Sequence, residues 1–109
     1  MRIFMKEKKL TSFESDLLEK LKNPEFAAAY LMTVIADRDI GFLPIALGDV
    51  AKAHGISDLA HETGIQRRTL YKIFHKEGNP SFELVARIIE GLGLKMDIGL
   101  KKPKKKKAL

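Results

Sequence analysis

The sequence has no cysteine among its 109 residues. It therefore has no disulfide, no thiol nucleophile and no cysteine-ligated metal site. No apolar run approaches the roughly 18–20 residues that a membrane-spanning helix requires. The opening residues, MRIFMKEKKL, lack the apolar centre of a signal peptide. These absences predict a protein that is soluble, works in the cytoplasm and does not contact a membrane.

Catalytic motifs are also missing. There is no GxxxxGK[ST] phosphate loop and no GxSxG nucleophile elbow. His61 and Glu62 are not followed by a second histidine at metalloprotease spacing, and Asp37 and Asp39 are expected to cap a helix rather than form an acid–base pair. The sequence therefore predicts no enzymatic activity, no cofactor and no metal.

The first half of the chain has no net charge. Residues 1–55 hold 8 basic and 8 acidic side chains, whereas residues 56–109 hold 12 and 6 and supply the whole net charge of +6. Six of those lysines lie in the final stretch KKPKKKKAL. Because a bulk charge of this kind is weak evidence for nucleic-acid binding, the position of the charges within the second half matters more.

Apolar residues recur at helical spacing along most of the chain. In the first predicted helix, for example, Phe13, Leu17, Leu18 and Leu21 share one face. Side chains suited to the N-cap precede four of the segments, namely Thr11, Asn23, Ser57 and Ser81, and Glu14 completes a capping box with Thr11. Helices are expected over residues 11–23, 23–37, 43–55, 58–63, 66–77 and 82–92.

The stretch after the last predicted helix changes period. Leu94, Met96, Ile98 and Leu100 alternate with polar residues and glycine, which is typical of a β-strand. A lone strand in a helical protein leaves its backbone groups unpaired. We therefore expect Leu94, Met96 and Ile98 to form a dimer strand that pairs with the same strand of a second copy.

These patterns together predict an all-α fold of five or six helices with a short C-terminal β-strand. The expected organisation is an N-terminal arm over residues 1–10, a single helical domain over residues 11–100, and a disordered lysine-rich tail over residues 101–109. Within the domain, residues 56–76 are expected to form a helix-turn-helix.

The helix-turn-helix prediction rests on a spaced set of small and apolar residues. Ala60 allows two helices to approach closely, and Gly64 suits a turn that requires positive φ. Ile65 follows the turn and enters the core. The complete predicted frame is Leu59, Ala60, Gly64, Ile65, Leu70 and Ile73.

The outer side of the second helix in this motif is basic. Arg68, Tyr71, Lys72 and His75 fall at helical spacing along one stripe, with Arg67 beside Tyr71. A recognition helix reads bases with its early residues, where arginine can pair with guanine and glutamine with adenine. The residues expected to read bases are Gln66, Arg67, Arg68, Tyr71 and Lys72. Those expected to bind DNA phosphates are Thr69, His75 and Lys76.

The segments LKNPEFAAAYL, LGDVAKAHGISDLAHETGI and RRTLYKIFHKEGNPSFELVARIIEGLGLKM carry a family resemblance. They resemble the Xre/Cro-type helix-turn-helix regulators, and more narrowly the HigA-like addiction-module antidote family, over about residues 20–98. The resemblance implies a lambda-repressor-like domain and the antitoxin of a type II toxin–antitoxin module. Such a protein represses its own operon and neutralises a RelE-like ribonuclease toxin, so the implied partners are a double-stranded DNA operator and that toxin.

Two departures and two alternatives accompany the resemblance. A capping serine is usual in such proteins where Gln66 stands here, and residues 36–49 replace a more acidic linker. One alternative is a plain Xre-family regulator, phage-borne or chromosomal, without a toxin partner. The other is a toxin-inhibiting module whose helix-turn-helix no longer reads DNA.

Overall fold

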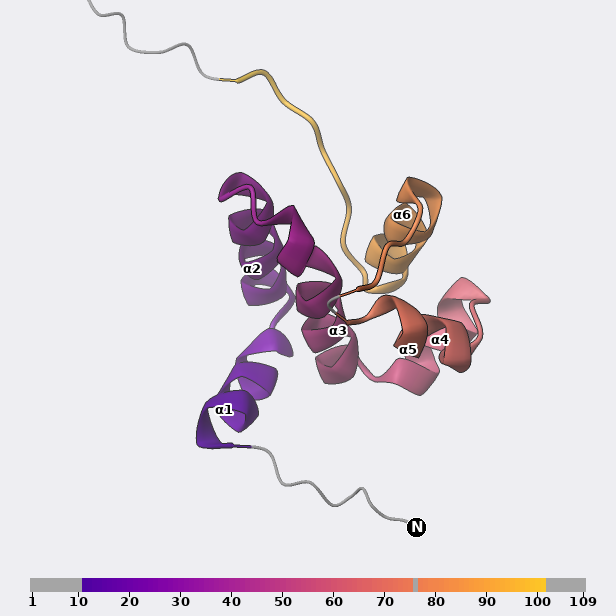
Figure 1. Cartoon of the computed structure of the whole chain (residues 1–109). Helices are drawn as coiled ribbons and strands as arrows, with labels where there is room; N and C mark the ends of the chain where they lie inside the picture. The colour runs from indigo at the N-terminus through magenta and orange to yellow at the C-terminus, as the bar shows by residue number, and fades with distance from the viewer. Residues whose placement is uncertain (1–10, 76, 102–109) are drawn as a thin grey trace, which may run out of the picture.

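The computed structural model describes residues 11–75 and 77–101. Within these ranges the chain forms six α-helices and one short 3-10 helix (Figure 1). The elements are α1 (Ser12–Leu21), α2 (Pro24–Ala36), η1 (Ile40–Phe42), α3 (Leu43–His54), α4 (Ile56–Thr63), α5 (Arg67–Ile73) and α6 (Phe82–Gly91). The predicted arm (residues 1–10), Lys76 and the tail beyond residue 101 lie outside the described residues.

Side-chain caps start three of the helices where the sequence predicts them. The Thr11 hydroxyl accepts from the Glu14 N–H at 3.0 Å, and the Glu14 carboxylate accepts from the Thr11 N–H at 3.0 Å. Asn23 caps α2 by accepting from the Glu25 N–H at 2.8 Å. Ser81 caps α6 by accepting from the Leu84 N–H at 3.1 Å. These local signals decide where the helices begin.

The predicted cap at Ser57 is wrong. Helix α4 begins one residue earlier, at Ile56, with Gly55 in the N-cap position and no side-chain cap. Gly55 has a φ of 111°, which turns the chain from the end of α3 directly into α4. Because one glycine both ends α3 and begins α4, Ser57 falls inside the helix.

Helix α3 lies at the centre of the fold and contacts α1, α2, α4 and α5 (Figure 1). Its Ala46, Leu47 and Ala51 are fully buried. Small side chains on a central helix allow neighbouring helices to approach closely, and the four-carbon side chain of Leu47 fills the space between them. The packing of α3 therefore positions the other helices relative to one another.

A polar contact joins α2 to this central helix. The Tyr30 hydroxyl donates to the Asp49 carboxylate at 2.8 Å. Burial, together with the hydrogen bond and the negative charge of Asp49, raises the pKa of Tyr30 well above its usual value. The hydroxyl therefore stays protonated as a hydrogen-bond donor at neutral pH.

Several apolar side chains that share the predicted inner faces are exposed. Phe13, placed by its spacing with Leu17 and Leu21, is 74% exposed, although Leu21 is buried. On α2, Ile35 is 46% exposed. Phe13 lies in the first turn of α1, and α1 reaches the core only through its C-terminal half, so helical spacing alone overstates the buried face.

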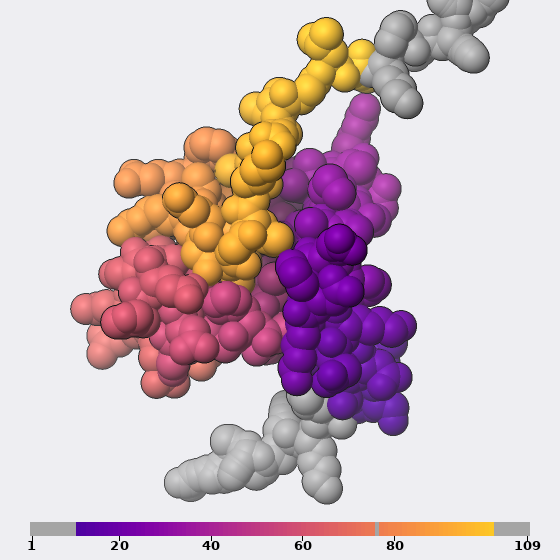
Figure 2. All heavy atoms as spheres, turned by 180° about the vertical axis from the view of Figure 1, so that it is seen from behind, coloured from indigo at the N-terminus to yellow at the C-terminus, as the bar shows by residue number. Residues whose placement is uncertain are grey.

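The C-terminal strand expected over residues 94–100 is absent from the part of the chain that the structure describes. The Leu94 N–H still bonds to the Ile89 carbonyl at 3.1 Å, but the following residues run outward as an extended chain (Figures 1 and 2). The side chains of Ile98 and Leu100 are 98% and 100% exposed. A ladder requires a second strand, and no other described segment supplies one.

No helix within residues 11–75 and 77–101 combines the length and the apolar character needed to cross a bilayer.

Candidate nucleic-acid interface

A short connection joins α4 to α5. Helix α4 ends at Gly64, which has a φ of 76° in the left-handed region. Ile65 and Gln66 complete the connection, and α5 begins at Arg67. The predicted positive φ at Gly64 is confirmed, and a residue with a Cβ would be strained there.

The residues predicted as a helix-turn-helix frame come together in the hydrophobic core. The core contains buried side chains from both helices and from the connection, with Ala60 half-buried against them. Leu59 and Leu70 are fully buried, and Ile65 and Ile73 are 6% exposed. Since the side chains on both sides of Gly64 are anchored in this way, the angle between α4 and α5 is set by packing rather than by the connection alone.

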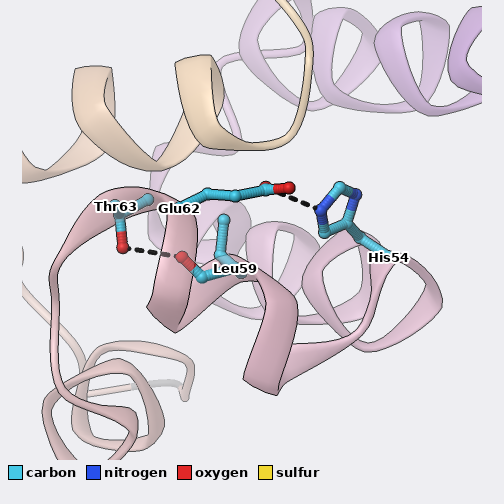
Figure 3. A network of polar contacts seen from close by, with 4 residues as sticks. All are labelled: His54, Leu59, Glu62 and Thr63. Atoms are coloured by element: carbon cyan, nitrogen blue, oxygen red, sulfur yellow. Dashed lines mark hydrogen bonds and ion pairs between the residues drawn. The ribbon is translucent and has the colours of Figure 1, made fainter.

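A threonine that the sequence analysis missed also holds the turn. The Thr63 hydroxyl donates to the Leu59 carbonyl at 2.8 Å (Figure 3) and accepts from the Ile65 N–H at 3.1 Å. The Thr63 carbonyl in turn accepts from the Arg87 guanidinium at 3.4 Å. A threonine directly before a glycine at a helix end is the sequence signal for such local bonding.

A polar side-chain contact links α3 to α4 beside this turn. His54 Nε2 lies 3.1 Å from Glu62 Oε1 (Figure 3), and the two side chains come from the last turns of their helices. The predicted place of His54 at the end of a helix is confirmed. Within the described residues no group of three or more histidine or acidic side chains could hold a metal ion.

The opposite side of α5 faces solvent and is basic. The residues predicted to read bases, Gln66, Arg67, Arg68, Tyr71 and Lys72, are all exposed, with Tyr71 at 50%. Among the described residues, no carboxylate forms an ion pair with Arg67, Arg68 or Lys72. The face therefore presents its positive charge and donors to solvent or to a partner.

The residues predicted to bind phosphate are less uniform. Thr69 lies on α5 and is half-buried. His75 is exposed and lies beyond the end of α5, where its Nδ1 is 3.3 Å from Glu77 Oε1. The stripe predicted from Arg68 to His75 therefore ends at Lys72. Lys76 lies outside the described residues.

Helix α5 is shorter than the sequence predicts. It was expected over residues 66–77 but ends at Ile73, and Phe74 leaves the helical region with φ −86° and ψ 53°. Phe74 packs on Gly48 of α3, where a Cβ would come within 2.8 Å of the Phe74 Cβ. This contact with a distant helix lies where α5 ends, and local helical propensity cannot indicate it.

The comparison with protein-family models identifies one family. Residues 9–100 match the model of a family described as "Probable addiction module antidote protein". This chain belongs to that family. It is also 34% identical over 83 residues, 76% of this chain and 86% of the relative, to an uncharacterized protein of Haemophilus influenzae. No solved structure matches at a significant level.

Membership of the antidote family implies a toxin partner in general and fits a protein that is not an enzyme. The family match includes the basic face of α5 and continues through the extended segment to residue 100. Both features therefore lie within the range of residues that matches the family model.

Proposed function

We propose that the protein is the antitoxin of a type II toxin–antitoxin module. It binds DNA in a sequence-specific manner, represses its own operon, and binds and neutralises a RelE-like ribonuclease toxin. The observation that supports DNA binding most directly is the exposed basic face of α5, whose angle to α4 is set by buried residues on both sides of Gly64. Membership of the antidote family supports the toxin partner.

In this proposal α5 enters the major groove. Arg67 and Arg68 lie at its start, where a guanidinium can donate two hydrogen bonds to guanine O6 and N7. Gln66 pairs with adenine, and Tyr71 and Lys72 reach bases further along. The phosphate contacts come from Thr69, His75 and Lys76, which position the protein without selecting a sequence.

The proposed DNA-binding unit is a homodimer. A single copy presents one α5, and specific operators are usually read as two half-sites about 34–36 Å apart by a two-fold dimer. Residues Leu94, Met96 and Ile98 are the proposed joint between the copies, because they alternate with polar residues and are followed by a fully exposed Leu100.

The proposed toxin contact lies on the other side of the molecule. A RelE-like ribonuclease holds RNA with a basic surface, so its inhibitor is expected to present acidic side chains there. The exposed acidic residues on α1 include Asp16 and Glu19, and Phe13 on the same helix is 74% exposed. An apolar side chain among carboxylates is suited to a protein interface.

The DNA-binding proposal is tested by binding of the protein to the DNA upstream of its own coding sequence. Arg68→Ala should weaken operator binding by ~1–3 kcal/mol and relax the preference at one base pair. Lys52→Ala is the control, because Lys52 is an exposed basic residue on α3 rather than on α5. Equal binding by wild type, Arg67→Ala and Arg68→Ala would show that α5 does not read bases.

Removal of residues 101–109 separates sequence reading from general attraction. The tail carries six lysines, and each lysine near a phosphate releases counterions. The truncated protein should bind all sequences more weakly by about the same factor, with a shallower dependence on salt. Loss of sequence preference on truncation, with Arg68→Ala without effect, would move the specificity to the tail.

The toxin proposal is tested with the product of the neighbouring gene. An adjacent reading frame for a RelE-like protein supports the antitoxin, and its absence supports a plain regulator. With that toxin, Phe13→Ala combined with Asp16→Lys should reduce neutralisation in a translation assay while DNA binding is unchanged. Arg68→Ala should weaken DNA binding and leave toxin neutralisation unchanged. A protein that neutralises the toxin but binds no DNA would instead be an inhibitor alone.

A further inference from the structure

The segment after α6 leaves the helical body with its apolar side chains uncovered. This segment comprises residues 94–101. Leu94 is half-buried against the core, but Met96 is 42% exposed and Ile98 is 98% exposed. Figure 2 shows the segment, in yellow, starting against the body and then running away from it. Within the described residues, the backbone of residues 95–101 forms no hydrogen bond. A chain of this kind has both a free edge and an apolar face.

The charged side chains of the segment lie together on its other face. Lys95 Nζ is 3.4 Å from Asp97 Oδ2, and both side chains are largely exposed. Residues two apart lie on the same side of an extended chain. The apolar residues at even positions therefore share the opposite side, as the sequence pattern predicts.

We propose that the segments of two copies pair as antiparallel strands in one register, centred on Met96. In this register Met96 faces the partner's Met96, and Leu94 faces the partner's Ile98. Lys95 faces the partner's Asp97, and by two-fold symmetry Asp97 faces the partner's Lys95. Opposite charges directly across a pair of strands stabilise it, and each such pair occurs twice in the dimer.

The neighbouring registers that also keep apolar residues opposite one another are disfavoured by charge. Centring the pair on Asp97 places it directly opposite the partner's Asp97. Centring it on Ile98 places Lys95 opposite the partner's Lys101. Like charges directly opposite one another destabilise a strand pair. The sequence of the segment therefore selects the register centred on Met96.

The body offers a place for the partner's Ile98 in this register. Leu94 lines a hollow of about 270 Å³ together with apolar residues that include Leu21, Val50 and Leu92, and with the polar side chains of Lys22 and His54. Directly opposite residues of an antiparallel pair project to the same side. The partner's Ile98 thus lies beside Leu94 and enters this hollow, which accounts for an isoleucine that is 98% exposed in the single chain.

Single cysteines test the register directly, because the chain has none of its own. In Met96→Cys the two sulfurs lie across the two-fold axis, and opposite Cα atoms about 4.5–5.5 Å apart suit a disulfide. In Asp97→Cys the two residues are diagonal neighbours about 7–8 Å apart, too far for an unstrained bridge. In Ile98→Cys the two cysteines lie further apart still.

Mild oxidation followed by non-reducing electrophoresis should give cross-linked dimer fastest with Met96→Cys. Ser57→Cys, on the exposed side of α4, measures cross-linking by random collision. Faster cross-linking of Asp97→Cys or Ile98→Cys would overturn the register. Cross-linking of Met96→Cys no faster than Ser57→Cys would overturn the pairing itself.

A charge exchange provides an independent test by sedimentation. Lys95→Glu and Asp97→Lys each replace both attractive pairs with repulsive ones, so each variant alone should dimerise more weakly, by roughly ten-fold. An equimolar mixture should recover dimer, because the glutamate of one chain then faces the lysine of the other. A Lys95→Glu variant that dimerises like wild type, or a mixture with no more dimer than its parts, would contradict the proposal. The register rests on the dimer joint proposed above. These measurements need neither DNA nor toxin, so their failure would overturn the joint and leave DNA binding and toxin neutralisation to their own tests.

Discussion

Phe74, at the end of α5, lies against the backbone of Gly48 in the middle of α3. A Cβ at Gly48 would come within 2.8 Å of the Phe74 Cβ and 3.2 Å of its Cγ. The contact therefore fixes how closely the end of α5 approaches the central helix.

Gly48→Ala should destabilise the protein, although alanine is the better helix former. The gain in helical propensity is about 0.5–1 kcal/mol, whereas forcing a side chain into a filled site costs about 1–3 kcal/mol. Urea unfolding should show a net loss. Gly41→Ala is the control, because a Cβ there meets no atom within 4 Å. A Gly48→Ala protein as stable as Gly41→Ala would show that Phe74 yields without cost.

Thr63→Val should cost about 1–2 kcal/mol of stability, because the Ile65 N–H at the turn loses its partner. Thr33→Val is a matched control. The Thr33 hydroxyl donates to the Ala29 carbonyl at 2.9 Å, the same bond that Thr63 makes to Leu59, but it is exposed and accepts no backbone N–H. Chemical denaturation of the two variants should separate them. If Thr63→Val and Thr33→Val lose the same stability, the loss comes from the hydroxyl-to-carbonyl bond that both threonines make, and not from the Ile65 N–H.

Gln66→Ser should stabilise α5 by about 1 kcal/mol. The backbone of Gln66, with φ −63° and ψ 144°, resembles that of Ser81, with φ −66° and ψ 161°, yet only Ser81 makes a capping bond. Thermal unfolding should show the gain, and Ser81→Gln should show the corresponding loss. If Gln66 also reads a base, operator binding falls in the more stable variant. Operator binding that is unchanged in Gln66→Ser would show that Gln66 has no role in DNA recognition.

Tyr30→Phe should lower stability by about 1 kcal/mol at neutral pH, because Asp49 loses a donor. The pKa of Tyr30 is raised in the folded protein, so its contribution is fully present below the ordinary value of about 10. It is lost as the pH rises above that value toward the folded pKa. The difference in unfolding free energy between wild type and Tyr30→Phe should therefore be constant up to about pH 9 and shrink in more alkaline solution. A constant difference through pH 11 would contradict this linkage.

The sequence predicts those features of the fold that neighbouring residues decide. The capping box of Thr11 and Glu14 and the caps at Asn23 and Ser81 are local, and each is confirmed. The turn at Gly64 requires only one backbone conformation and is also confirmed. The frame around that turn follows because helical spacing identifies the inner faces of two consecutive helices.

Features that depend on distant contacts were predicted wrongly or missed. At the end of α5, Phe74 packs on Gly48, which precedes it by 26 residues. The strand predicted at Leu94 is absent because none of the described residues supplies a second strand for it to pair with. At the candidate interface, helical spacing indicated the exposed side of α5, but the place of His75 beyond the helix depends on where the helix ends. The DNA-contact roles of these residues remain predictions.

The short length of α5 limits how much sequence one copy could recognise. Its seven residues span about 10 Å at a rise of 1.5 Å per residue, which matches about three base pairs at 3.4 Å each. With four distinguishable pairs per position, a three-pair site recurs by chance about once in 64 positions. If two copies act together as proposed, a six-pair site would recur by chance only about once in 4,000 positions. The proposed joint between the copies would therefore add as much selectivity as a second α5.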